Sequence, residues 1–151
     1  MKMTKQEVKE EFKQLEGDVY VKTRLRQMGR NMLRKKMIAD VPSADVVITN
    51  PTHFAVALKY KPGETSAPIV VAKGIDFLAL KIREIAILNK IEIVEDPPLA
   101  RILYKLVDVD KEIPDELFKA VSAVLVYVYQ LRSGKYVSYN KYDIDESEFS
   151  K

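Results

Sequence analysis

The stretch ADVVITNPTHFAVALKY, residues 44–60, contains two apolar runs separated by the polar tetrapeptide Asn-Pro-Thr-His at 50–53. Runs rich in Val and Ile on both sides of a short polar insert predict two β-strands, at 44–49 and 54–60, joined by a tight turn. Asn and Pro are ordinary turn residues, so the simplest interpretation is that they only reverse the chain. A second interpretation is chemical, because an Asn-Pro bond has an unusual reaction open to it.

Three further patterns predict the rest of the sheet. The apolar run at 69–73 predicts a third strand, the pattern at 77–89 a helix, and the run at 91–95 a returning strand. Asp76 is placed to cap this helix, and Asn89 suits a left-handed residue at its end. A strand, a helix and a strand in this order predict a right-handed crossover and a parallel pair.

Two more helices are predicted toward the C-terminus. Asp96 precedes two prolines, which is typical of a capped helix start, and a second helical pattern extends from Pro114 to Gly134. Residues 133–151 are polar and without period, so we expect a disordered tail there.

These elements together predict an α/β fold. We expect a small mixed sheet of four to five strands, mostly antiparallel with one parallel pair, surrounded by about four helices. A long basic N-terminal linker helix precedes it. The expected domains are a basic helical linker at 1–40, a globular domain at 41–132 and the tail at 133–151.

The positive charge of the chain lies in the linker. Residues 1–40 contain eleven Lys and Arg against six Asp and Glu, a net charge of +5, although the whole chain carries only +3. Residues 22–36 contain no acid, and Gly17 with Asp18 predicts a break before them. Such a segment is typical of a solvated or juxtamembrane linker, or of a surface that binds anionic lipid. Nucleic acid is not expected, because no stacking aromatic residue lies between Lys22 and Ala39.

Composition excludes the common catalytic sites. The chain has one histidine, His53, and no cysteine, so a zinc site is improbable and a serine triad would have to be built at the turn itself. No glycine-rich phosphate loop is present. We therefore expect no metal, no cofactor and no turnover enzyme.

The Asn-Pro bond is open to attack from its own side chain. Pro51 has no N–H, so its nitrogen cannot attack the Asn50 side chain as it does in ordinary deamidation. Asn50 Nδ2 can instead attack the Asn50 carbonyl carbon, close a five-membered succinimide and expel the Pro51 nitrogen. Such ring closure can gain about 7 to 11 kcal/mol over a bimolecular reaction if the atoms are held near attack geometry. A backbone N–H of Thr52 or His53 would stabilise the oxyanion, and the His53 imidazole would carry a proton to the leaving nitrogen.

Five segments identify a family resemblance: ADVVITNPTHFAVALKYK, APIVVAKG, LALKIREIA, PPLARILYKL and IPDELFKAV. In order and spacing they resemble the cytoplasmic domain of the FlhB/YscU/SpaS family, the switch proteins of the type III secretion export apparatus, and most of all its flagellar members. The resemblance covers residues 3 to about 132. It implies single-turnover self-cleavage of the asparagine peptide lyase type between Asn50 and Pro51, with Thr52 and His53 in support.

The resemblance also implies a function and a set of partners. Cleavage would switch the export substrates from the rod and hook type to the filament type. The implied partners are the export gate protein FlhA, other components of the apparatus, a secreted ruler protein that controls hook length, and early export substrates. The implied substrate-binding patch consists of Ala67, Pro68, Ser122 and Leu125.

The resemblance further places the whole protein in the bacterial inner membrane, anchored by a transmembrane region upstream, with this domain on the cytoplasmic side. The two cleavage fragments are expected to stay associated. Two alternatives remain open: an uncleaved docking module that binds export partners or anionic lipid through its basic helix, and, more remotely, a basic RNA-binding protein.

Overall fold

A computed structural model describes residues 4–51 and 53–149 of the chain. It consists of two compact units, Met1–Lys36 and Met37–Lys151. The elements in chain order are α1 (Lys5–Asp40), η1 (Val41–Ser43), β1 (Val46–Asn50), β2 (Phe54–Lys59), β3 (Ile69–Ile75), α2 (Asp76–Leu88), β4 (Glu92–Glu95), α3 (Pro97–Leu106), η2 (Asp115–Leu117), α4 (Phe118–Arg132) and η3 (Glu146–Phe149).

The linker region is one continuous helix, α1. Its start carries the reciprocal cap of a capping box, because the Glu7 N–H donates to Thr4 Oγ1 and the Thr4 N–H donates to Glu7 Oε2, both at 3.2 Å. The predicted break at Gly17 is wrong. Strong helix formers surround this glycine, and its cost of about 1 kcal/mol is small against the propagation of a helix this long.

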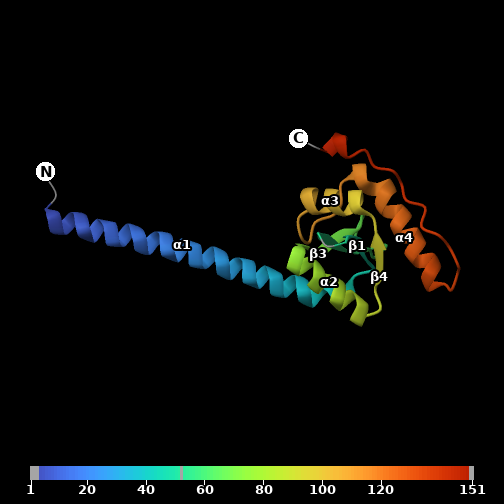
Figure 1. Cartoon of the computed structure of the whole chain (residues 1–151), viewed down its shortest axis with the longest axis horizontal. Helices are drawn as coiled ribbons and strands as arrows, with labels where there is room; N and C mark the ends of the chain where they lie inside the picture. Colours follow the sequence, from blue (N-terminus) through green and yellow to red (C-terminus); the bar gives the residue numbers. More distant parts are fainter. Residues whose placement is uncertain (1–3, 52, 150–151) are drawn as a thin grey trace. The chain divides into compact units, whose positions relative to one another are not determined.

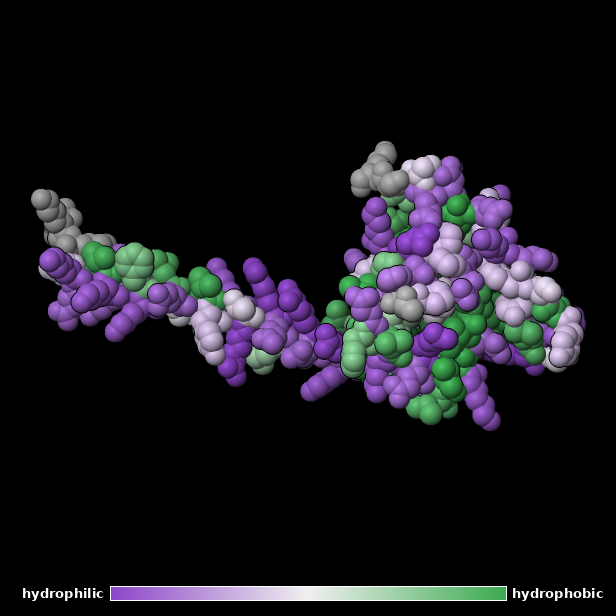
Figure 2. All heavy atoms as spheres, in the orientation of Figure 1, coloured by the Kyte–Doolittle hydropathy of each residue, from purple (hydrophilic) through white to green (hydrophobic). Residues whose placement is uncertain are grey.

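Every described residue of α1 up to position 36 is exposed. Figure 2 shows mainly hydrophilic side chains along this helix, with apolar ones scattered among them. Among the described residues, no helix is long and apolar enough to cross a membrane.

Four strands form the sheet of the second unit, in the order β3-β2-β1-β4. β1 and β2 pair antiparallel, as do β2 and β3, while β1 and β4 are parallel. The predicted α/β class with a mixed sheet and one parallel pair is therefore confirmed. The strands that flank α2 are not the parallel partners, however. β3 instead pairs with β2, the strand before it in the chain, and forms one edge of the sheet. α2 then connects β3 to β4 at the opposite edge, where β4 pairs with β1.

Helices cover both faces of this sheet (Figure 1). Side chains alternate along β1: Val46 and Ile48 point into a core formed with α3 and α4, whereas Val47 points into a core formed with α2. Met37 and Val41 complete the second core. β1 therefore lies between the two cores, with side chains packed on both of its faces.

The ends of α2 differ from prediction. Asp76 does not cap the helix with its side chain; it is the first helical residue and adopts a left-handed backbone with φ 47°. Asn89 has φ −99°, and the left-handed residue is its neighbour Lys90, with φ 58°. The predicted cap of α3 is confirmed, since the Asp96 side chain accepts from the Leu99 N–H.

Residues 135–149 pack against the domain, unlike the disordered tail that their composition predicts. Gly134, with φ 80°, ends α4 in a left-handed conformation. Beyond it, Tyr139, Ile144 and Phe149 lie half-buried against the core formed with α3 and α4. Three such anchors in a mostly polar segment are too few to give a periodic signal in the sequence.

Candidate functional site

The Asn-Pro bond lies in the tight turn between β1 and β2. Asn50 is the last residue of β1 and pairs with Phe54, the first residue of β2. The His53 N–H donates to the Asn50 carbonyl oxygen at 3.0 Å, which closes the turn. Thr52 lies outside the residues that the structure describes. The carbonyl that would be attacked is therefore already polarised by one amide donor.

A second hydrogen bond fixes the far side of the turn. The Asp76 N–H donates to the His53 carbonyl oxygen at 3.0 Å, so the junction of β3 and α2 holds the His53 peptide. This junction is tight: a Cβ on Gly74 would lie 2.6 Å from Leu78 Cγ. Asp76 itself adopts the left-handed conformation, which costs a non-glycine residue on the order of 1 kcal/mol or more.

The strand before the bond is held from its other side. The Asp96 N–H donates to the Thr49 carbonyl oxygen at 3.0 Å, just beyond the parallel pair of Thr49 and Glu95. Thr49 and Asp96 are both buried, at 4% and 3% exposed. Asn50 is therefore the end of a buried strand that is paired on both sides.

Exposure differs across the turn. Asn50 and Pro51 are half-buried, whereas His53 is exposed. A shallow crevice beside the bond is lined by Thr49, Asn50, Pro51, Phe54, Ala55, Ala79, Leu80 and Arg83. Asn50 is thus partly shielded from water, while the His53 imidazole can exchange protons with it.

The predicted substrate patch is mostly not a surface. Ala67 and Leu125 are 4% and 5% exposed and belong to the core formed with α3 and α4, and Pro68 is buried as well. Only Ser122 is exposed. Leu125 therefore lies in the core and not on an accessible surface; α4 is apolar on more than one face, and its sequence does not separate the core side from the open side.

An open groove does lie beside Ser122. It measures about 660 Å³ and is lined by Phe118, Lys119, Ser122, Ala123, Val126, Tyr127, Gln130, Ser138, Asn140 and Tyr142. Val126, 53% exposed, is one of the apolar residues of α4 in this groove, and sequence reasoning missed it although it follows Ser122 by one helical turn. Asp76 and Asp96 were missed as parts of the site because both act on it through backbone N–H groups.

Comparison with known proteins places these features in one family. A profile of the FlhB HrpN YscU SpaS Family matches residues 1–128. The flagellar biosynthetic protein FlhB of Bacillus subtilis is 48% identical over 136 residues, which are 90% of this chain and 38% of that protein.

Solved structures agree with this match. The cytoplasmic domain of FlhB from Shewanella putrefaciens has a TM-score of 0.67 and 45% identity, over 71% of this chain and 87% of that one. A mutated EscU C-terminal domain has a TM-score of 0.59 and 36% identity, over 61% of this chain and 92% of that one. The chain spans little more than a third of the length of the Bacillus relative.

Proposed function

Because the chain belongs to the FlhB HrpN YscU SpaS Family, we propose that it is the cytoplasmic part of a flagellar protein-export component that cuts its own backbone between Asn50 and Pro51. The cut changes the class of substrate that the apparatus exports, from rod and hook proteins to filament proteins. One observation carries the proposal most directly: the His53 N–H lies 3.0 Å from the Asn50 carbonyl oxygen, where negative charge would develop.

The reaction consists of one ring closure and one bond cleavage. Asn50 Nδ2 attacks the Asn50 carbonyl carbon, and the His53 N–H stabilises the resulting oxyanion. The bond to the Pro51 nitrogen then breaks, leaving a C-terminal succinimide on Asn50. The proton lost from Nδ2 reaches the Pro51 nitrogen, which leaves as a neutral secondary amine and then takes a second proton from water to become cationic. The exposed imidazole of His53 is the nearest group in sequence that can relay this proton.

The fold favours this reaction by fixing both sides of the turn. The Asp96 N–H holds the Thr49 carbonyl before the bond, and the Asp76 N–H holds the His53 carbonyl after it. Preorganisation of this kind reduces the entropy lost on reaching the attack geometry. It matters here because an amide nitrogen is a weak nucleophile.

The partners belong to the same proposal. We expect the domain to act beside the export gate protein FlhA and a secreted ruler protein, and to contact early export substrates. The whole protein would be anchored in the inner membrane. The contact surface for substrates is the groove that contains Ser122 and Val126, since Leu125 is in the core.

Asn50→Ala tests the proposal because it removes only the nucleophile. We expect the native chain to give two bands on a denaturing gel and Asn50→Ala to give one. Asn31→Ala, an exposed asparagine of α1, is the matched control and should leave both bands. Mass spectrometry should place the new N-terminus at Pro51. A fragment beginning at Pro51 in the Asn50→Ala chain would contradict the mechanism.

A second candidate function is docking without cleavage. It is favoured by α1, whose residues 22–36 are exposed and contain no acid. This arrangement suits anionic lipid headgroups. A native chain that remains a single band but sediments with vesicles containing phosphatidylserine, and not with neutral ones, would support this candidate instead.

A further inference from the structure

The C-terminal segment 136–149, which we call the strap, follows a defined course over the domain. It leaves the end of α4, passes along that helix and ends as η3 near α3 (Figure 1). The rings of Tyr127 on α4 and Tyr139 on the strap lie 5.4 Å apart between centroids. Ile144 and Phe149 pack against the core further along.

The first anchor of the strap is linked to the strand that carries Asn50. The Tyr139 hydroxyl donates to Asp96 Oδ2 at 2.8 Å. The same aspartate caps α3 with its other carboxylate oxygen and donates its N–H to the Thr49 carbonyl. Burial and this hydrogen bond raise the pKa of Tyr139. These hydrogen bonds therefore connect Tyr139 through Asp96 to Thr49, the residue before Asn50. Thr49 lies in β1, which we expect to keep its place in the sheet after cleavage.

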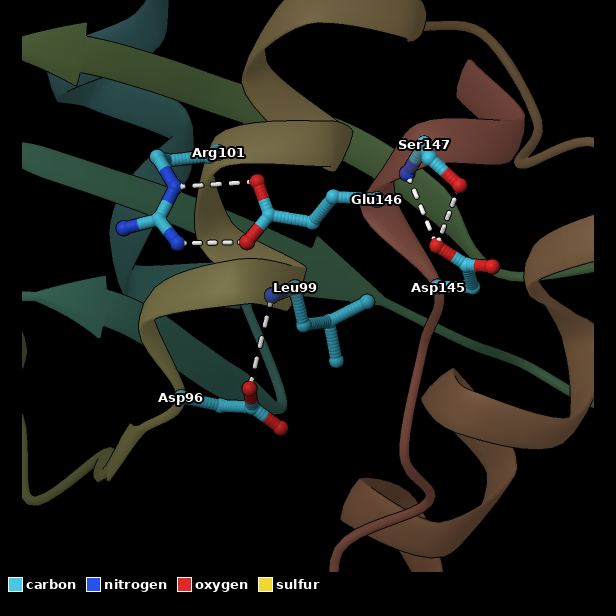
Figure 3. Close-up of polar contacts among 6 residues, drawn as sticks. All are labelled: Asp96, Leu99, Arg101, Asp145, Glu146 and Ser147. Atoms are coloured by element: carbon cyan, nitrogen blue, oxygen red, sulfur yellow. Dashed lines mark hydrogen bonds and ion pairs between the residues drawn. The ribbon is translucent and has the colours of Figure 1, made fainter. Parts of the chain in front are cut away.

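The second anchor is an ion pair at the other end of the strap. Both oxygens of the Glu146 carboxylate accept hydrogen bonds from the Arg101 guanidinium on α3 (Figure 3). The hydrogen bond from Arg101 lowers the pKa of Glu146. The Asp145 carboxylate accepts from the backbone N–H and the hydroxyl of Ser147, which orders the first turn of η3.

This second end shares a pocket with the strand that follows the cleavable bond. The pocket measures about 630 Å³ and is lined by Phe54, Arg101, Ile102, Tyr104, Lys105, Glu146, Ser147 and Phe149. Phe54 lies 5.2 Å from the Tyr104 ring between centroids, and it pairs with Asn50 across the turn. One wall of the pocket is therefore formed by Phe54, the first residue of β2 after the turn.

We propose that the strap reports the state of the Asn50–Pro51 bond: cutting the bond releases its Phe149 end, while its Tyr139 end stays docked. The inference rests on the proposed self-cleavage. After the cut, Pro51, His53 and Phe54 become the free start of a chain, so Phe54 loses its covalent tether to Asn50 and is held against Tyr104 only by its pairing in the sheet, with Ile75 of β3 on one side. Thr49 keeps its strand pairing, so the contact through Asp96 to Tyr139 persists.

Release of this end changes the surface of α3. It frees the Arg101 guanidinium from the Glu146 carboxylate and opens the pocket that Tyr104 and Phe149 line together. A local cut thereby alters charge and apolar exposure on an adjoining face.

Spin labels test the proposal, because the chain contains no cysteine and single labels are easily placed. Glu148→Cys reports on the Phe149 end and Lys141→Cys on the middle of the strap; both positions are exposed. In the Asn50→Ala background we expect a restricted nitroxide at both positions. In the cleaved chain, the label at 148 should rotate several-fold faster and the label at 141 should not change. Equal mobility at 148 in both chains, or a freely rotating label at 148 in the Asn50→Ala chain, would overturn the inference.

A second comparison works without cleavage and so separates this inference from the proposed function. In the Asn50→Ala background, Phe54→Ala removes the pocket wall and should free the label at 148. Tyr60→Ala removes another aromatic that packs against the same core, beyond the opposite end of β2, and should leave the label restricted. If the native chain gives a single band, self-cleavage fails while this pair still tests the coupling. A label that stays restricted in Phe54→Ala would refute the coupling even if cleavage occurs.

Discussion

The backbone and the side chain of His53 have separate roles at the turn. Its backbone N–H donates to the Asn50 carbonyl, and its carbonyl accepts from the Asp76 N–H, while its imidazole is exposed. A side-chain substitution therefore removes the proposed proton carrier and leaves both backbone hydrogen bonds.

His53→Ala is expected to slow self-cleavage without abolishing it. Loss of proton transfer typically costs about 10²- to 10⁴-fold, whereas the oxyanion donor and the ring-closure geometry remain. The first-order rate of fragment appearance on denaturing gels measures the effect, and added imidazole should restore part of the rate. A chain that cuts at the native rate would show that the imidazole takes no part.

For single residues, the sequence predicts a role at the site only where the proposed chemistry involves neighbours in the chain. The proposed reaction of Asn50 with Pro51 depends on two adjacent residue types, so the sequence alone is enough to suggest it. Asp76 and Asp96 reach the site through backbone N–H groups placed by the fold, and a main-chain donor carries no signature of residue type.

At the scale of elements, the junction of β3 and α2 connects packing to the site. Gly74 lets α2 approach β3 so closely that an added Cβ would lie 2.8 Å from Leu78 Cβ. The first residue of α2, Asp76, then donates to the turn. A change in this packing is transmitted directly to the His53 peptide.

Gly74→Ala is therefore expected to lower both stability and the rate of cleavage. Overpacking of this kind costs about 1 to 3 kcal/mol, and the shift of α2 lengthens the Asp76 to His53 hydrogen bond. Chemical denaturation and the cleavage rate measure the two effects. Gly17→Ala is the matched control: nothing lies within 4 Å of its Cβ, so it should strengthen α1 slightly and leave the rate unchanged. A stable Gly74→Ala chain with a native rate would contradict this role of the junction.

α4 provides the second test at this scale. Leu125→Asp buries a carboxylate in the core and should destabilise the domain by about 3 kcal/mol or more. Val126→Asp, on the open side of the same helix, should leave the melting temperature nearly unchanged while weakening the binding of an early export substrate in the groove. If Leu125→Asp lost little stability, Leu125 would be accessible and would belong to the predicted substrate patch.

At the scale of the whole molecule, alternation and caps in the sequence predict the four strands and the helices α2, α3 and α4. They do not predict strand order, because β3 and β1 are both edge strands once β1, β2 and β3 have paired, and no local pattern decides which of them β4 joins. The docking of residues 135–149 is likewise unreadable, because Tyr139 and Glu146 find partners 43 and 45 residues away in the chain. Both features are tertiary and have no local pattern.

Strand order has a direct consequence for the cleaved molecule. The proposed cleavage would leave β1 on the fragment that ends at Asn50, and β1 lies inside the sheet, between β2 and β4. Val46, Val47 and Ile48 are fully buried, and burial contributes about 1.5 to 3 kcal/mol for each such side chain. Removing this fragment would also leave two rows of backbone N–H and C=O groups without partners.

The two fragments are therefore expected to remain one folded molecule. A native affinity tag on residues 1–50 should retain the second fragment at a one-to-one ratio, and both should co-elute on size exclusion until urea unfolds the domain. The Asn50→Ala chain is the control for elution volume. Since the cut bond lies in a turn, the melting temperatures of the cut and uncut chains should differ far less than the loss of β1 would require. Separation of the fragments without denaturant would mean that the turn, rather than the pairing of β1 on both sides, holds the strand in the sheet.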